Sequence, residues 1–433
     1  MANRRSIGLL SASSLVVANM IGTGVFTTSG FLLADLGSPW WVLLAWLVGG
    51  LLATMGALCY GALARRIPES GGEYLFLSRT LHPAAGYVAG WISLLVGFSA
   101  PLAMAAFAFG EYTRPWLGGV RPQIAGSALL LLFALIHGTH VERGALVQNL
   151  AVWIKLLAVA LFVALGLSRL PILENGPVQP VQFGSFAVSL VWISFSYSGW
   201  NAAVYLGGEI RDPEKNLPRS LLLGATSVML VYLALNGMFV FSAPVEALAG
   251  QVDIGRIAAE ALGGARWGMA LTGVVALALI TSVSSMMMAG PRVYARMAGD
   301  GYLPRWLRES EGPPRAAILL QLALSLLMLW SSTFESLLTY IGFTLGLSTA
   351  GTVLGLVLLR LRNGREIAIP GWPWVPAVFV ASVLLISSYT VFQRPKESLV
   401  GFVTMGIGWL GWWFTGRKQS GKRTGSEETI SKG

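Results

Sequence analysis

Long apolar runs recur from one end of this 433-residue chain to the other, and they constrain its fold more than any other feature. Each run reaches at least ~18–20 residues, the length at which an α-helix spans the hydrocarbon core of a bilayer. Charged residues make up only 12% of the sequence, about half the share usual in soluble domains. Ten-residue strands of alternating polarity are not found, which argues against a membrane barrel. The chain is therefore predicted to be an all-α, polytopic membrane protein.

Hydropathy predicts about twelve spans within one transmembrane domain, residues 1–415. They are expected at 7–34, 39–64, 84–113, 122–138, 144–168, 183–208, 219–243, 265–290, 315–331, 335–360, 371–391 and 397–415. The first span follows Arg4 and Arg5, as the apolar segment of a signal peptide would. No small-residue cleavage site follows a short apolar segment, so we expect this span to remain as a helix of the mature protein. The tail, residues 416–433, is rich in Lys, Ser, Gly and Thr and is expected to be disordered.

Basic residues are distributed unequally between the two sides of the predicted membrane. With the N-terminus inside, 22 Lys or Arg lie in cytoplasmic segments and seven on the opposite side. Both termini are therefore predicted to be cytoplasmic. This topology explains the net charge of +10. The basic residues are scattered over many loops, which argues against nucleic-acid binding. Arginine-heavy loops and short tails point to a bacterial plasma membrane.

Two of the predicted spans contain residues that interrupt a helix near mid-membrane. The first contains Ile21-Gly22-Thr23-Gly24-Val25-Phe26, and the sixth contains Phe195-Ser196-Tyr197-Ser198-Gly199-Trp200-Asn201. Glycine costs about 1 kcal/mol against alanine in a helix. Discontinuous helices at corresponding positions of two halves are the best sequence indication of a transporter binding site. The two breaks lie five spans apart, as inverted repeats of five helices require.

The broken ends predict a receptor for the zwitterionic backbone of an amino acid. A half-helix that begins near Gly24 presents free amides and a positive dipole end, which suit a carboxylate. Half-helices that end near Ile21 and Phe195 present free carbonyls, which suit an ammonium group. The alternative is that Gly22 and Gly24 only allow close helix packing. We favour the binding site because a second break stands at the matching position.

The sequence resembles the amino acid–polyamine–organocation superfamily, and within it the L-type amino acid transporter branch. The resemblance covers the first ten spans and is carried by four stretches: Ile21 to Phe26 (IGTGVF), 68–74 (PESGGEY), Tyr197 to Asn201 with 209–218 (YSGWN and EIRDPEKNLP), and 292–304 (RVYARMAGDGYLP).

The resemblance implies a LeuT-like fold of two inverted five-helix repeats, about 7–168 and 183–360, with helices one and six broken and two peripheral helices, 371–415. It also implies amino acid binding at the breaks. Phe195 would be the aromatic gate, Ser196 and Ser198 would line the pocket, and Asn201 would stabilise the unwound region. Backbone groups of Ile21, Gly22, Thr23 and Gly24 complete the expected site. For Trp200 we expect an ordinary packing role.

Two departures from the family pattern limit what the resemblance implies. Ala62 stands where the family usually has an acidic residue, which weakens any inference about the cytoplasmic gate. Human members bond to a heavy chain through a cysteine after the third span, and the corresponding loop, 114–121, has none. The single cysteine, Cys59, lies inside a predicted span. No disulfide-linked partner is expected.

Lys155 is the only charged side chain well inside a predicted span, where solitary charge is costly, so it is a functional candidate. The family resemblance implies that it occupies the place of a sodium site. It is either a proton carrier or a charged strut that binds carbonyls of the first span. Desolvation favours the first role and carbonyl partners favour the second.

The sequence places no acidic residue and no arginine at the depth of the breaks, which favours neutral L-amino acids over cationic or acidic ones. We expect an exchanger or a proton-coupled symporter, with protons as the candidate coupling ion. The alternatives are a permease for cationic amino acids or polyamines, and a sensor that binds without transporting. An enzyme is disfavoured because His82, His137 and His140 lie in loops without a triad, and we expect no cofactor, metal or catalytic residue.

Overall fold

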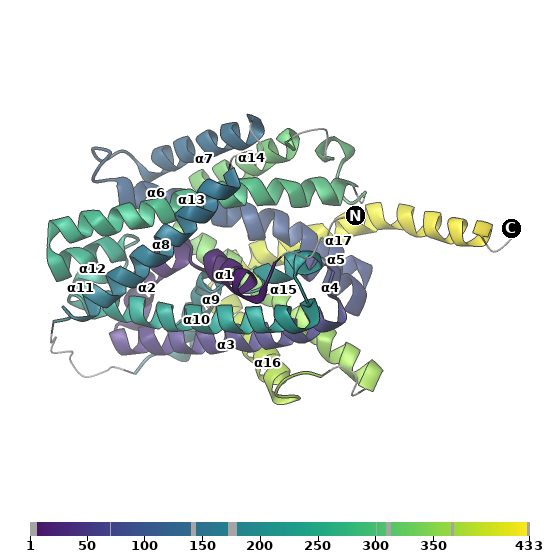
Figure 1. The fold of residues 1–433 in the computed structure, drawn as a ribbon, viewed down its shortest axis with the longest axis horizontal. Helices are drawn as coiled ribbons and strands as arrows, with labels where there is room; N and C mark the ends of the chain where they lie inside the picture. The colour runs from purple at the N-terminus through teal and green to yellow at the C-terminus, as the bar shows by residue number, and fades with distance from the viewer. Residues whose placement is uncertain are drawn as a thin grey trace.

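The computed structural model describes residues 7–69, 71–139, 144–171, 180–299, 301–308, 313–364 and 368–430. In these ranges the chain is helical, and its only β pairing is an isolated bridge between Ile7 and Ile210 (Figure 1). The elements are α1 (Leu9–Met20), α2 (Thr23–Leu36), α3 (Pro39–Arg66), α4 (Gly72–Thr80), α5 (Pro83–Ile92), the π-helix η1 (Ser93–Ser99), α6 (Ala100–Thr113), α7 (Pro122–Thr139), α8 (Gly144–Leu167), α9 (Phe183–Ser196), the 3₁₀ helix η2 (Ala202–Glu209), α10 (Pro213–Val240), α11 (Val245–Leu248), α12 (Ile254–Gly263), α13 (Ala265–Gly299), the 3₁₀ helix η3 (Arg305–Leu307), α14 (Arg315–Ser331), α15 (Phe334–Asn363), α16 (Trp374–Gln393) and α17 (Pro395–Ile430).

The long apolar helices confirm the prediction of an all-α, multi-pass membrane protein. Among the described residues, seven helical stretches are long and apolar enough to cross a membrane, and the bent pair α1–α2 is an eighth. Shorter apolar helices at Ile154–Leu167, Phe183–Ser196 and Arg315–Ser331 fall on three further predicted spans. The total of twelve stays a prediction.

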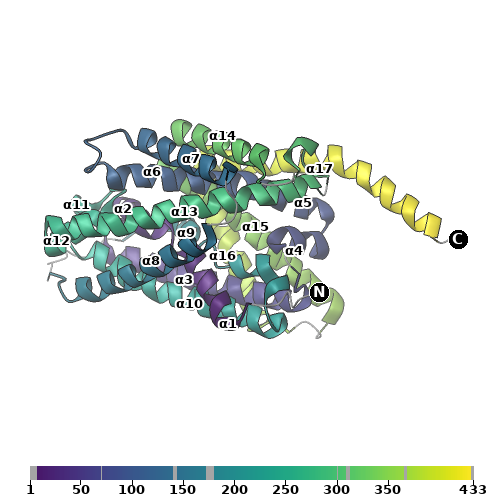
Figure 2. The same ribbon diagram turned by 45° about the horizontal axis from the view of Figure 1, so that its top comes forward.

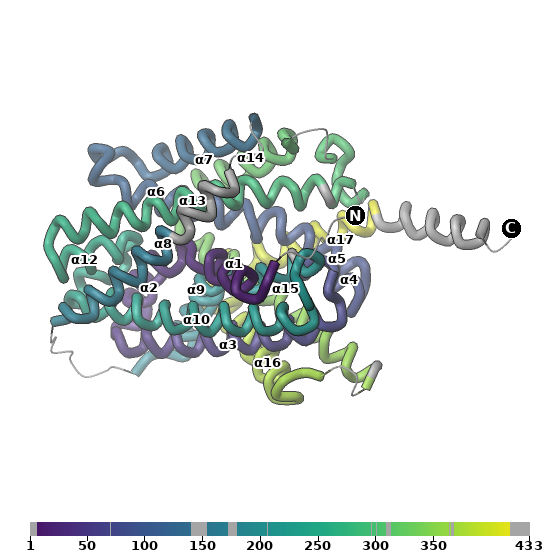
Figure 3. The backbone as a smooth tube through the Cα atoms, in the orientation of Figure 1, coloured from purple at the N-terminus to yellow at the C-terminus, as the bar shows by residue number. Residues whose placement is uncertain are grey.

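The helices form a bundle with a pair of helices along each of two opposite edges. α7 and α14 lie side by side along one edge, and α3 and α10 lie side by side along the opposite edge, in both views (Figures 1 and 2). The same pairs can be traced along the backbone tube (Figure 3). Between the edges α1 packs against α10, and α2 packs against α9, so the two interrupted regions meet inside the bundle.

Local sequence explains where several of these helices begin and bend. α3, α5 and α10 each have proline in their first turn, where the missing N–H costs no hydrogen bond. The π-helix η1 ends at Ser99, two residues before Pro101, which cannot donate to a regular α-helical ladder. Because α5, η1 and α6 follow one another directly, they form a single span, Pro83–Thr113.

The structure adds details that hydropathy did not predict. The sixth predicted span, 183–208, consists of α9, a turn over residues 197–201, and the 3₁₀ helix η2. Three short helices, α4, α11 and α12, lie in segments that we expected to be loops. Of the tail expected at 416–433, residues 431–433 lie outside the described ranges. The division into domain, repeats and tail stays a prediction.

Candidate substrate-binding site

A cavity of about 730 Å³ lies between the two interrupted regions. Its lining comes from α1, α2, α6, α8, α9 and α13, and it reaches the surface along α1, where Leu10 is exposed. The lining includes most of the predicted site residues: Gly22, Thr23, Gly24, Lys155, Phe195, Ser196 and Ser198. Ile21 and Asn201 are not in the lining. The segments singled out in the sequence therefore surround one cavity.

The first break lies between α1 and α2, whose axes differ by 43°. α1 ends at Met20, and α2 starts at Thr23 with Gly22 as its N-cap. No side chain caps α2, and its first turn borders the cavity. The first amides of a helix have no partner within the helix, and the dipole adds positive potential at this end. The geometry therefore suits a carboxylate at the start of α2.

Gly22 and Gly24 differ in the space around them. A Cβ at Gly24 would stand 2.4 Å from Ser196 Oγ and 2.6 Å from Ser196 Cα, so this glycine lets α2 touch the end of α9. A Cβ at Gly22 would meet nothing closer than 3.9 Å, and one of the nearest atoms belongs to the cavity residue Ser282. The close-packing alternative thus applies at Gly24, whereas Gly22 borders open space.

The second break follows α9, which ends at Ser196. Gly199 in the following turn has a φ of 96°, which side chains rarely adopt, and a Cβ there would stand 2.8 Å from the Asn19 carbonyl oxygen. The turn therefore lies directly against the last turn of α1. Phe195, 7% exposed, lines the cavity, as do Ser196 and the half-buried Ser198.

Lys155 is bound to the first broken helix. Its side chain is 2% exposed, and its Nζ donates to the carbonyl oxygen of Ile21 at 2.6 Å and lies 3.5 Å from that of Ala18. Among the described residues no carboxylate lies within 4.0 Å of this nitrogen. The Ile21 carbonyl, which we expected to be free for a substrate ammonium, already has one partner. A strut would make these contacts, and both roles of Lys155 stay predictions.

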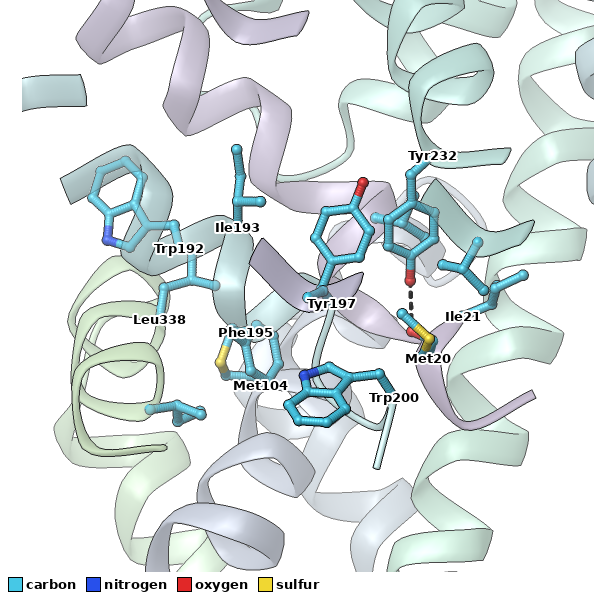
Figure 4. Packing of buried hydrophobic residues seen from close by; sticks show 14 of the residues in the cluster. Met20, Ile21, Met104, Trp192, Ile193, Phe195, Tyr197, Trp200, Tyr232 and Leu338 are labelled. Atoms are coloured by element: carbon cyan, nitrogen blue, oxygen red, sulfur yellow. Dashed lines mark hydrogen bonds between the residues drawn. The ribbon is translucent and has the colours of Figure 1, made fainter. Parts of the chain in front are cut away.

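Tyr232 on α10 joins both breaks and was missed in the sequence. Its hydroxyl lies 2.5 Å from the carbonyl oxygen of Met20, the last residue of α1 (Figure 4). It also lies 3.1 Å from the carbonyl oxygen of Ser196, the last residue of α9. The ring packs against Tyr197 and Trp46, which are also buried. A single tyrosine in an apolar helix gives no periodic or motif signal, so only the fold reveals this contact.

Asn201 and Trp200 lie away from the cavity. The Asn201 side-chain amide donates to Glu73 on α4 at 3.1 Å, a partner that the sequence did not indicate, and its stabilising role stays a prediction. Trp200 is 7% exposed and packs edge-on against Tyr60 with 4.6 Å between ring centroids. The expected packing role of Trp200 fits this contact.

An interior cavity between two interrupted helices of a multi-pass bundle defines a secondary transporter. The chain belongs to the amino acid permease family, whose sequence model matches residues 7–414. This match confirms the resemblance to the amino acid–polyamine–organocation superfamily and places the chain among transporters, not enzymes.

The chain is similar to curated amino acid transporters over most of its length. It is 30% identical over 412 residues to the large neutral amino acids transporter small subunit 2 of Mus musculus, which covers 90% of this chain and 75% of the relative. The human protein of that name is 31% identical over 381 residues, covering 84% and 71%. The Asc-type amino acid transporter 1 of Mus musculus is 28% identical over 425 residues, covering 93% and 79%.

Proposed function

We propose that this permease transports neutral L-amino acids by alternating access and binds them between the two broken helices. The amides at the start of α2 would bind the carboxylate, and carbonyl oxygens at the ends of α1 and α9 would bind the ammonium group. Phe195 would cover the substrate, and Ser196 and Ser198 would contact its side chain. The names of the relatives above, a large neutral amino acids transporter subunit and an Asc-type amino acid transporter, support the substrate class.

One observation carries the choice of neutral substrates. Lys155 is the only charged residue in the lining of the cavity among the described residues, and its ammonium is already bound to backbone carbonyls. A cationic side chain entering this space would lose its hydration without meeting an anion, which is costly. An acidic one would find no arginine. Neutral side chains avoid both penalties.

Uptake into proteoliposomes that contain only the purified protein tests this proposal. With all twenty amino acids offered in turn, we expect accumulation or counterflow of neutral ones and at least tenfold lower rates for arginine, putrescine and glutamate. Preferred uptake of arginine or putrescine would favour the alternative of a cationic amino acid or polyamine permease. Saturable binding without any uptake would instead identify a sensor.

Coupling, location and partners belong to the same proposal. We place the protein in a plasma membrane, that of a bacterium, with both termini in the cytoplasm, and the cavity would then face the cytoplasm along α1. Transport would occur by exchange or by proton symport. Cys59, the only cysteine of the sequence, is 0% exposed inside α3, so a disulfide-linked heavy chain has no attachment point.

A further inference from the structure

Glu73 is a buried carboxyl group that the proposed binding site does not use. It lies on the short helix α4, between the spans α3 and α5, and is 8% exposed. In the described part of the chain no basic nitrogen lies within 4.0 Å of its carboxyl oxygens. Buried carboxylates are usually paired with a cation, because burial without one is expensive. The Glu73 carboxyl group must therefore be stabilised by something other than a cation.

The backbone before Glu73 brings it against the unwound region. Gly72 has a φ of 58°, and a Cβ at this position would stand 2.2 Å from the ring of Tyr205 in η2. Glycine therefore lets the start of α4 lie directly on the segment that follows the second break. This contact directs the Glu73 side chain into the junction between α3, η2 and α15.

Three uncharged groups from three different elements bind this carboxyl group. Oε1 accepts hydrogen bonds from the Tyr60 hydroxyl of α3 at 2.8 Å and from the Asn201 side-chain amide, just before η2, at 3.1 Å. Among the described residues Oε2 has a single partner, the Ser348 hydroxyl of α15, at 2.9 Å. Ser348 is 8% exposed, so water has little access to this side of the site.

This arrangement accommodates the neutral acid without losing a hydrogen bond. With a proton on Oε2, Oε1 becomes the carbonyl oxygen and still accepts from Tyr60 and Asn201. The acid O–H then donates to Ser348 Oγ, because a serine hydroxyl can accept as well as donate. All three contacts are kept, and no buried charge remains to be compensated.

We propose that Glu73 is a proton-binding site, protonated in this arrangement, through which cytoplasmic pH controls the opening of the cavity. The inference rests on the proposed alternating access and on the proposed orientation, which places α4 on the cytoplasmic side. In the state that closes the cavity, the junction around Glu73 opens and its carboxyl group is hydrated and ionised. Proton release from Glu73 therefore accompanies closure on the cytoplasmic side.

The sign of the pH effect follows from burial. Desolvation raises the pKa of Glu73 above its ordinary value of 4.5, and the hydrogen bonds from Tyr60, Ser348 and Asn201 oppose the rise without cancelling it. A raised pKa means that acid favours this arrangement, and the stabilisation is lost as pH increases through the raised value. A difference of one pKa unit between the two states changes their ratio by about tenfold across the titration.

The other ionisable groups on the elements around Glu73 have contacts of their own. Tyr60 and Tyr205 are phenols, which stay neutral well above pH 7. On α5 the hydroxyl of Tyr87 binds the carbonyl of Tyr302, and on α4 Arg79 is paired with Glu69. His82, at the start of α5, accepts a hydrogen bond from the backbone N–H of Ala84 through Nδ1. α15 contributes the uncharged Ser348.

Substrate-free protein in detergent tests the proposal separately from transport. A cysteine introduced at Ser14, which lines the cavity on α1, would report its accessibility to a maleimide, while the buried Cys59 stays unreactive. We expect the labelling rate, taken relative to that of a free thiol at the same pH, and the unfolding temperature to fall as pH increases from about 5 to 8. Glu73→Gln should keep both high at every pH, because its amide donates to Ser348 as the neutral acid does.

Glu69→Gln is the matched control, because Glu69 lies four residues away and its side chain is 56% exposed. It should keep the pH dependence of the parent. Ser348→Ala removes one of the hydrogen bonds that oppose the rise in the pKa of Glu73 and should move the titration to higher pH, which a merely structural contact would not do. The proposal is overturned if Glu73→Gln retains the parent's pH dependence, or if Ser348→Ala leaves the midpoint unchanged when Glu73→Gln does not fold. Loss of uptake with these pH effects intact would contradict only the proposed function.

Discussion

Gly22 and Gly24 stand two residues apart at one helix break, yet a side chain added at each position would meet different surroundings. At Gly24 it would collide with the backbone and hydroxyl of Ser196, so substitution there separates α2 from α9. At Gly22 it would enter open space beside the amides of the first turn of α2. The two positions can therefore separate the packing role of a glycine from a binding role.

We expect Gly22→Val to abolish substrate binding without destabilising the fold. The backbone at Gly22 is extended, so valine is tolerated, but its methyl groups would occupy the place of the carboxylate. Affinity should fall at least tenfold, or about 1.4 kcal/mol. Gly24→Ala should instead lower the free energy of unfolding by about 1–3 kcal/mol through overpacking. Isothermal titration and thermal unfolding in detergent measure the two effects, and wild-type affinity in a folded Gly22→Val variant would move the site elsewhere.

At the scale of elements, the helix breaks were predictable because their signals are local. Glycines and hydroxyl residues interrupt otherwise apolar runs, and α1–α2 and α9–η2 end where those residues stand. Apart from the contact of Lys155 with the first span, the contacts that hold the broken ends were not predictable. Tyr232 and Met20 are 212 residues apart, and Glu73 and Ser348 are 275 apart, so no periodicity links them. The short helices α11 and α12 were missed because they are too short to show as apolar runs.

Removing the Lys155 side chain tests how the first broken helix is held. Since its Nζ binds the Ile21 carbonyl, we expect Lys155→Ala to release the end of α1 and to weaken substrate binding by about 1.5–3 kcal/mol, the usual worth of a hydrogen bond to a charged group. Tyr232→Phe removes the other tether and should cost about 0.5–1.5 kcal/mol. Equilibrium binding measures both.

The two roles of Lys155 lead to different pH behaviour. A strut predicts weaker binding in Lys155→Ala and little effect of pH on binding by the wild type. A proton carrier predicts loss of pH-driven accumulation while counterflow exchange survives. If Lys155→Ala binds and transports normally at every pH and without sodium, neither role is correct.

At the scale of the whole molecule, the orientation in the membrane decides to which side of the membrane the cavity opens. The cavity opens along α1, and the topology proposed from the inequality of Lys and Arg between the loops would place that end in the cytoplasm. The carboxyl group of Glu73 would then respond to cytoplasmic pH. Both inferences depend on this topology, which can be measured directly.

Cysteine labelling in intact cells provides that measurement, because the native Cys59 is fully buried. Leu117 lies in the loop between α6 and α7 and is 43% exposed, and Trp306 lies between α13 and α14 and is 62% exposed. With the N-terminus inside, a membrane-impermeant maleimide should modify Leu117→Cys in intact cells and Trp306→Cys only after permeabilisation. The reverse pattern would place the cavity on the outer side, and Glu73 would then respond to external pH. If both cysteines were labelled in intact cells, the number of spans between residues 117 and 306 would differ from the prediction.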